Sequence, residues 1–148
     1  MYQRILVPVD GSTTSDCALQ EALKLAQGQS AQLELAHVVE DIRLLDSDSY
    51  INYAELQETI KSKGNKILAH AQTLAQLAGL TADVKLLEAN GERIANVIIA
   101  EAMRWPADLI VIGTHGRSGF SRLLFGSVAE GVVRVAQTPV LLIRGAKV

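Results

Sequence analysis

A glycine-rich stretch near the C-terminus has the residue types of an anion-binding loop. It contains Gly113, Gly116 and Gly126. Ser127 follows, directly before a helical pattern that covers residues 128–136. Glycine lets a backbone approach a ligand closely and adopt positive φ angles. The N–H groups of such a loop, and those at the start of a helix, attract a negatively charged ligand. The stretch therefore predicts an anion site.

Asp10 ends the first apolar run of the chain. If the first and fourth strands are neighbours in a parallel sheet, the loops that follow them open on the same crevice. An acidic side chain beside a glycine-rich loop suits a nucleotide, because the carboxylate can accept from a ribose hydroxyl while the loop amides bind phosphate. The alternative is a turn in which Asp10 accepts from the N–H of Ser12 or Thr13. The sequence leaves both interpretations open.

Ser127 also has two interpretations. Ser127 and Glu130 have the spacing of a capping box, in which the serine hydroxyl accepts from the backbone of the first helical turn. The same hydroxyl could instead donate to a phosphate oxygen. Both roles place Ser127 at a helix N-terminus, so the sequence does not separate them, and they could alternate with occupancy of the site.

The glycine-rich stretch also contains Arg117, Arg122 and His115. Either arginine could pair with a phosphate or remain a solvated surface residue. We favour Arg117 as the phosphate partner because it directly follows a glycine. No nucleophile or second base lies at a spacing from His115 that is typical of a catalytic pair. We therefore interpret His115 as a loop residue and assign no catalytic residue.

The remaining histidines and the cysteine indicate no metal centre. Three widely separated histidines and one cysteine lack the spacing of a metal site. His37, near the end of the second strand, either borders an adenine pocket or is a core residue, and His70 takes an ordinary helix position. Cys17 has no internal disulfide partner, and we expect it to be a small buried residue on a helix.

Three common motifs are absent from the sequence. It contains no Gly-x-x-x-x-Gly-Lys-Ser/Thr, which excludes a Walker-type NTPase. It has no Gly-x-Gly-x-x-Gly after the first strand, the fingerprint of dinucleotide binding, and no Gly-x-Ser-x-Gly elbow of the α/β-hydrolases. The anion site therefore belongs to none of these classes.

Composition and charge restrict the class of protein. The chain has 148 residues, enough for one domain, and 49% are hydrophobic but only 4% aromatic, so we expect an aliphatic core. A net charge of −2 with interspersed signs argues against nucleic-acid binding. No apolar run approaches the ~20 residues of a membrane span, and the N-terminus lacks the features of a signal peptide. With a single cysteine, these features indicate a cytoplasmic protein without membrane or nucleic-acid partners.

Short aliphatic runs alternate with helical patterns along the chain. We expect strands at 4–10, 32–39, 82–87, 109–112 and 140–143, and helices at 16–27, 52–78, 92–104 and 128–136. Nearly continuous apolar strands separated by helices predict a parallel sheet that is covered on both faces. No repeat, linker or low-complexity segment interrupts the pattern, so we expect residues 1–148 to form one α/β domain.

Residues with special backbone requirements refine these boundaries. Pro8 removes a ladder donor, so we place it near the carboxyl end of the first strand. Gly28 is expected to stop the first helix. Asn52, with Glu55 three residues later, resembles a capping box at the start of the long helix, and Gly64 inside that helix permits a bend.

The spacing in the glycine-rich stretch resembles that of the universal stress protein family. Its nucleotide-binding members carry Gly-x2-Gly-x9-Gly-Ser/Thr, and Gly113, Gly116, Gly126 and Ser127 match this pattern without departure. The flanking residues and the start Ile-Leu-Val-Pro-Val-Asp-Gly-Ser are similar as well, so the resemblance spans the chain. It implies the ATP-binding subclass and a Rossmann-like, three-layer α/β/α sandwich whose five-stranded parallel sheet has the order 3-2-1-4-5.

The resemblance also implies roles for particular residues. ATP would lie across the ends of the first and fourth strands, with Mg²⁺ or Mn²⁺ carried by the nucleotide. Asp10 would approach the ribose, and Pro8, Val9 and Val38 would line the adenine site. The phosphates would be surrounded by Gly113, Gly116, Arg117, Gly126 and Ser127. A homodimer would form through Val140 to Ile143, which agrees with our expectation that an apolar edge strand is covered or paired.

Three functions are compatible with these residues. The first is an ATP-binding, stress-response or regulatory homodimer without fast catalysis, because no convincing general base or nucleophile is present. The second is a slow ATPase or adenylate-handling enzyme, for which His115 and Ser127 are the only candidate residues. The third is an interaction dimer whose glycine-rich loop stays empty, and the intact motif argues against it.

Overall fold

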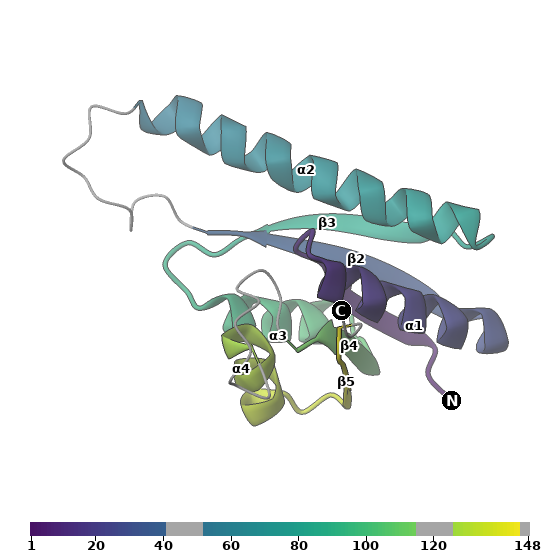
Figure 1. Ribbon diagram of the computed structural model, residues 1–148. Helices are drawn as coiled ribbons and strands as arrows, with labels where there is room; N and C mark the ends of the chain where they lie inside the picture. Colours follow the sequence, from purple (N-terminus) through teal and green to yellow (C-terminus); the bar gives the residue numbers. More distant parts are fainter. Residues whose placement is uncertain (41–51, 115–125, 146–148) are drawn as a thin grey trace.

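The computed structural model describes residues 1–40, 52–114 and 126–145, in which five strands alternate with four helices (Figure 1). The strands are β1 (Arg4–Pro8), β2 (Gln32–Val39), β3 (Ala82–Glu88), β4 (Leu109–Gly113) and β5 (Val140–Ile143). The helices are α1 (Thr13–Gln29), α2 (Tyr53–Leu77), α3 (Ile94–Arg104) and α4 (Ser127–Val135). Pro8 is the last residue of β1, as its missing N–H predicts.

All neighbouring strands are parallel, and their order is β3-β2-β1-β4-β5, which confirms the expected topology. The register sets Ile5 of β1 opposite Leu33 on β2 and Leu109 on β4. The strand order reverses between β1 and β4, so the crevice outside their carboxyl ends is the expected place for a ligand.

Two aliphatic clusters cover the two faces of the sheet and complete three layers. One joins alternate residues of β1, β2 and β4 to α1 and α2, and the other joins the intervening residues to α3 and α4. Ile5 and Val7 belong to the first cluster and Leu6 to the second, and all three are inaccessible to solvent. Each such side chain contributes roughly 1.5–3 kcal/mol of transfer free energy. The clusters hold the carboxyl ends of β1 and β4 in fixed positions.

The end of α1 differs from the prediction. The helix continues through Gly28, which does not adopt the positive φ angle of a glycine that ends a helix. It ends at Ser30, whose φ of 54° is left-handed and whose N–H donates to the Ala26 carbonyl. The predicted stop at Gly28 is therefore wrong by two residues.

Of the helix starts predicted for α2 and α3, the structure confirms only the first. The Asn52 side chain caps α2 by accepting from the N–H groups of Ala54 and Glu55, which confirms the predicted cap. Helix α3 begins at Ile94 and not at residue 92, because Asn90 and Gly91 adopt positive φ angles in a turn. Residues 41–51, between β2 and α2, lie outside the described residues.

Candidate functional site

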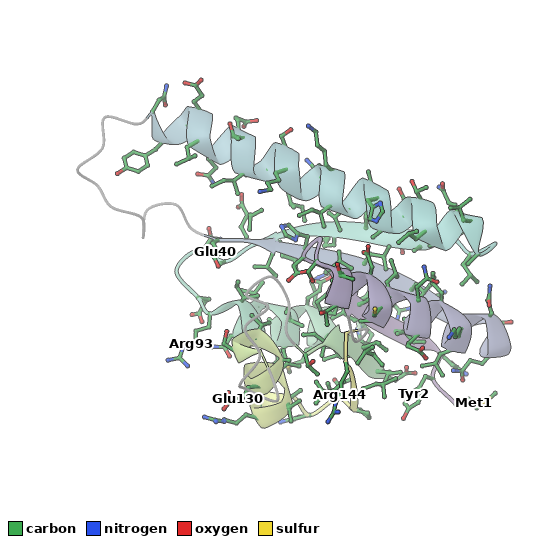
Figure 2. All side chains as sticks on the ribbon, in the orientation of Figure 1. Met1, Tyr2, Glu40, Arg93, Glu130 and Arg144 are labelled. Carbon is green, nitrogen blue, oxygen red and sulfur yellow. The ribbon has the colours of Figure 1, made fainter. Side chains whose placement is uncertain are left out.

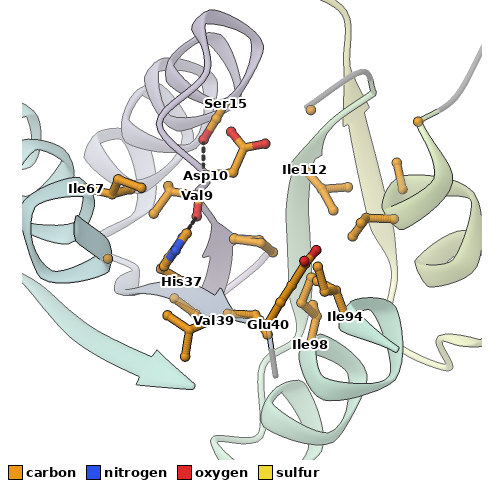
Figure 3. Close-up of a pocket in the computed structure, with 18 of the residues that line it drawn as sticks. Val9, Asp10, Ser15, His37, Val39, Glu40, Ile67, Ile94, Ile98 and Ile112 are labelled. Atoms are coloured by element: carbon orange, nitrogen blue, oxygen red, sulfur yellow. Dashed lines mark hydrogen bonds between the residues drawn. The ribbon is translucent and has the colours of Figure 1, made fainter. Parts of the chain in front are cut away.

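A crevice of about 500 Å³ opens at the carboxyl ends of β1, β2 and β4 (Figure 3). Helices α2 and α3 and the start of α4 supply its walls. It is lined by Pro8, Val9, Asp10, Ser15, Ala36, His37, Val38, Val39, Glu40, Ile60, Lys63, Gly64, Ile67, Ile94, Ile98, Ile112, Gly113, Thr114, Gly126, Ser127, Val128 and Ala129. Its volume falls in the range of small-molecule sites.

Most residues singled out from the sequence meet in this crevice. Seven of the nine residues predicted to bind the nucleotide line it: Pro8, Val9, Asp10, Val38, Gly113, Gly126 and Ser127. They come together because β1 pairs directly with β4, so the loops after both strands open on one side. Gly116, Arg117, His115 and Arg122 lie outside the described residues.

Asp10 forms the local turn that the sequence allowed. Its Oδ1 accepts from the N–H of Ser12 at 2.9 Å, and its own N–H donates to the Ser15 hydroxyl at 3.1 Å (Figure 3). Ser12 in turn caps α1 by accepting from the Ser15 N–H at 3.1 Å. A carboxylate has about four acceptor positions, so this turn leaves room for a ligand hydroxyl. The two interpretations of Asp10 are therefore compatible.

The backbone N–H and C=O groups of Val38, referred to below as the Val38 peptide edge, face the crevice. The N–H of Val9 donates to the Ala36 carbonyl at 2.8 Å, so the peptide groups of Ala36 face β1. Peptide groups alternate along a strand, and those of Val38 therefore face the same side. Strand β1 ends at Pro8, before it reaches the level of Val38. The N–H and C=O of Val38 thus form an adjacent donor and acceptor at the wall of the crevice.

His37 lies at the wall of the crevice and is not a fully buried core residue. It is half-buried, lines the crevice, and holds its Nδ1 atom 2.7 Å from the Val9 carbonyl oxygen (Figure 3). A carbonyl oxygen only accepts, so Nδ1 carries the proton. His70 lies on the exposed part of α2, 3.3 Å from an Asp16 oxygen.

Helix α4 begins at Ser127, and this start overturns the capping-box interpretation. Gly126 occupies the N-cap position with φ −65° and ψ 157°, and no side chain caps the helix in the described part of the chain. Ser127 lies one residue too late to act as the cap, and Glu130 pairs with Arg134 at 2.8 Å. Backbone N–H groups of the first turn, together with the exposed Ser127 hydroxyl, are therefore available to an anion.

Thr114 is a polar residue of the crevice that the sequence did not single out. Its side chain is buried, and its Oγ1 atom has no hydrogen-bond partner among the residues that the structure describes. Its N–H donates to the Ile143 carbonyl at 3.0 Å, and its own carbonyl accepts from the Gly126 N–H. A hydroxyl residue directly after a buried strand is the only signal that could have identified it.

Helices α2 and α3 contribute crevice residues that no local pattern indicated. Ile60, Lys63 and Ile67 of α2 line one wall, and Ile94 and Ile98 of α3 line another. Glu40, which follows β2 (Figure 2), also lines the crevice (Figure 3). The sequence marks these isoleucines as core positions because their periodicity does not distinguish a packed face from a pocket wall.

The described residues contain no group of three histidine, cysteine, aspartate or glutamate side chains that could hold a metal ion. Among the described residues, no helix is both long and apolar enough to span a membrane.

The sequence profile of the universal stress protein family matches residues 1–144. The chain is 32% identical to universal stress protein MJ0531 of Methanocaldococcus jannaschii over 147 residues, covering 99% of this chain and 85% of that protein. It is 34% identical to universal stress protein YxiE of Bacillus subtilis over 151 residues, covering 97% and 100%, respectively.

Solved structures with the same fold include nucleotide complexes. A universal stress protein family member from Burkholderia pseudomallei has a TM-score of 0.79 and 34% identity over 98% of this chain and 97% of that chain. A universal stress protein in complex with cAMP has a TM-score of 0.73 and 27% identity over 98% and 99%. The protein from Archaeoglobus fulgidus in complex with dAMP has a TM-score of 0.70 and 26% identity over 96% and 98%.

Proposed function

The chain belongs to the universal stress protein family, and on this premise we propose that its crevice binds ATP as part of a stress-response or regulatory homodimer. The observation that carries the proposal is the meeting of Asp10, the Val38 peptide edge and the N-terminus of α4 in one crevice. The complexes of two structural relatives with cAMP and dAMP support an adenine nucleotide as the ligand class.

The base would lie against Pro8, Val9 and Val38. These side chains are apolar and line the crevice beside the Val38 peptide edge. Adenine presents an acceptor, N1, next to a donor, the N6 amino group, and this order complements an N–H next to a C=O. Asp10 would then accept from a ribose hydroxyl with the carboxylate capacity that its turn leaves unused.

The phosphates would lie at the opposite wall, where β4 ends and α4 begins. Gly113, Gly126 and Ser127 line this part of the crevice, and the helix start adds N–H groups and a positive dipole end. The Thr114 hydroxyl is a further donor nearby. Gly116 and Arg117 complete the phosphate site in this proposal on the strength of the motif. Mg²⁺ or Mn²⁺ would be held mainly by phosphate oxygens, which suits the scarcity of carboxylates at the described walls.

The proposed homodimer would pair through β5. This strand is an edge of the sheet, and Leu141 exposes 37% of its surface there. An apolar edge strand with unpaired backbone groups is prone to pair with another chain. A second copy would supply that pairing and cover Leu141.

Titration calorimetry with purified, nucleotide-stripped protein and Mg²⁺ tests the proposal. Absence of ATP binding at millimolar concentration would contradict both nucleotide binding and the alternative of a slow ATPase. Binding without phosphate release over hours would contradict the ATPase alone. Gly126→Val is expected to abolish binding because its side chain would occupy the space of a phosphate, and unchanged affinity would refute this placement.

A further inference from the structure

The β1–β2 ladder stops one bond short of its full length. The last backbone bond of this ladder runs from the Val9 N–H to the Ala36 carbonyl at 2.8 Å. The next would run from the Val38 N–H to the Val9 carbonyl, and within the described residues it is not formed. The Val9 carbonyl instead receives the Nδ1–H of His37 at 2.7 Å. A side-chain donor has replaced a backbone donor.

We propose that His37 is a positioning residue that reserves the Val38 N–H for the nucleobase. By donating to the Val9 carbonyl oxygen, the imidazole occupies the acceptor with which the Val38 N–H would otherwise pair. The Val38 N–H, which has no backbone partner within the described ranges, and the adjacent C=O are then pre-organised for a base that presents an acceptor beside a donor. This inference rests on the proposed nucleotide site and adds to it the origin of base selectivity.

Gly64 of α2 makes the space that the imidazole needs. A Cβ atom at Gly64 would lie 2.9 Å from His37 Cδ2 and 2.8 Å from Leu86 Cδ1, closer than side chains tolerate. Glycine destabilises a helix interior relative to alanine, so its presence in α2 requires a compensating reason. That reason is the close approach of α2 to the ring, which fixes the imidazole between the helix and the Val9 carbonyl. The expected bend at Gly64 is not needed to explain this glycine.

The arrangement favours adenine over guanine. Adenine presents the N1 acceptor beside the N6 donor, whereas guanine presents the N1–H donor beside the O6 acceptor. With the ribose held at Asp10, an N–H and a C=O in one order complement only one of these edges, and a mismatched polar group loses its partner on binding. His37 acts on this choice indirectly, through the availability of the Val38 N–H.

The test compares ATP with 1-deaza-ATP, which lacks the N1 acceptor, by titration calorimetry. The wild-type protein is expected to bind ATP about tenfold more tightly than 1-deaza-ATP, the ratio typical of one hydrogen bond. In His37→Phe the ratio is expected to fall towards one, because the Val38 N–H can turn to the Val9 carbonyl. His70→Phe makes the same change on the exposed part of α2 and is expected to keep the wild-type ratio.

The outcomes separate this inference from the proposed function. A folded His37→Phe protein with the wild-type ratio would assign His37 a structural role only and overturn the inference. Failure of the wild-type protein to bind ATP would overturn the proposed function and the inference together. ATP binding with no preference over 1-deaza-ATP would leave the nucleotide site standing and overturn the role of His37.

Amide hydrogen exchange supplies a measurement that needs no variant. In the ligand-free wild-type protein, the Val38 amide is expected to exchange much faster than that of Ala36, which is paired within the ladder. Addition of ATP is expected to slow the exchange of Val38. Equal protection of Val38 and Ala36 without ligand would show that the N–H is already bonded and would overturn the inference.

Discussion

Gly113 of β4 lies directly against Thr14 of α1. A Cβ atom at Gly113 would be 2.7 Å from Thr14 Cγ2 and 3.0 Å from the Thr14 carbonyl oxygen. The first glycine of the phosphate motif is therefore required by the packing of α1 on the sheet, whether or not a ligand is bound. Its presence alone is weaker support for a phosphate site than the N-terminus of α4.

We predict that Gly113→Ala destabilises the ligand-free fold. Overpacking typically costs about 1–3 kcal/mol, and urea unfolding would measure the loss. Thr14→Ala removes Cγ2 and should restore part of the stability, while the contact with the Thr14 backbone remains. Gly28→Ala is the matched control, because its Cβ meets nothing within 4 Å and helix propensity should add up to about 1 kcal/mol. Equal effects of the two glycine substitutions would contradict the packing role.

Ser127→Ala should separate ligand binding from helix capping. Ser127 does not cap α4, so we expect the free energy of unfolding to change by less than about 0.5 kcal/mol. Loss of a hydrogen bond to a charged phosphate should weaken ATP binding by about tenfold or more in calorimetry. Ser12→Ala removes a true cap, whose hydroxyl accepts from the Ser15 N–H, and should cost about 0.5–2 kcal/mol of stability. A stability loss at Ser127 like that at Ser12 would contradict the assigned helix start.

Asp10→Asn should keep the turn and weaken the proposed ribose contact. The amide oxygen can still accept from the Ser12 N–H, so thermal stability should be nearly unchanged. Hydrogen bonds to a charged acceptor are stronger than neutral ones by about 1 kcal/mol, so ATP affinity should fall roughly fivefold. Asp16→Asn on α1 is the control and should bind normally. Wild-type affinity in a stable Asp10→Asn protein would remove Asp10 from the ribose site.

A buried carboxyl pair lies away from the crevice, between β2 and α3. Glu34 and Glu101 are 3% and 4% exposed, and Arg104 donates to both Glu101 oxygens. Burial, followed by a hydrogen bond and charge repulsion from Glu101, raises the pKa of Glu34 to about 8, although Arg104 and Lys85 oppose this. Burial also raises the pKa of Glu101, but the hydrogen bonds from Arg104 and Glu34 outweigh it and hold that pKa below its usual value. Glu34 is therefore protonated at neutral pH.

This pair predicts a decrease of stability with rising pH. Between the usual glutamate pKa of 4.5 and about 8, the folded protein binds a proton at Glu34 that the unfolded chain lacks. The free energy of unfolding should therefore fall over this window, by up to about 1.4 kcal/mol per pH unit for this group. Glu101 acts in the opposite sense only below pH 4.5, because its pKa is lowered.

Urea unfolding of Glu34→Gln across this pH window provides the measurement. Glutamine keeps the size of the side chain without a titrating proton, so its stability profile should be flatter than that of the wild-type protein. Glu130→Gln, at an exposed pair on α4, should keep the wild-type slope. Parallel profiles for Glu34→Gln and the wild-type protein would refute the assignment.

Leu141→Lys should dissociate the proposed homodimer. A charged side chain on an exposed edge strand disfavours pairing with a second chain. Sedimentation equilibrium is expected to report a dimer for the wild-type protein and a monomer for the variant. Leu77→Lys at the end of α2, near the opposite edge of the sheet, should remain a dimer. A wild-type monomer at micromolar concentration, or a dimeric Leu141→Lys protein, would contradict pairing through β5.

The sequence by itself determined the fold class, the element order and the glycine motif on which the candidate site is predicted. Apolar runs such as residues 4–8 and 109–113 are local signals, because strands buried on both faces must be apolar along their whole length. The spacing of Gly113, Gly126 and Ser127 is also readable without a structure. The predicted pairing of the first and fourth strands is confirmed.

Only the tertiary structure decided what the individual side chains do. The start of α4 at Ser127, the bond from His37 to Val9 and the space at Gly64 all depend on register or on contacts between distant elements. The close approach of Thr14 to Gly113 is of the same kind. Local patterns record which face of an element is apolar, but a partner across the sheet or on a packed helix leaves no periodic trace in the sequence. The physical reason is that such contacts are fixed by the packing of layers, which joins residues far apart in the chain.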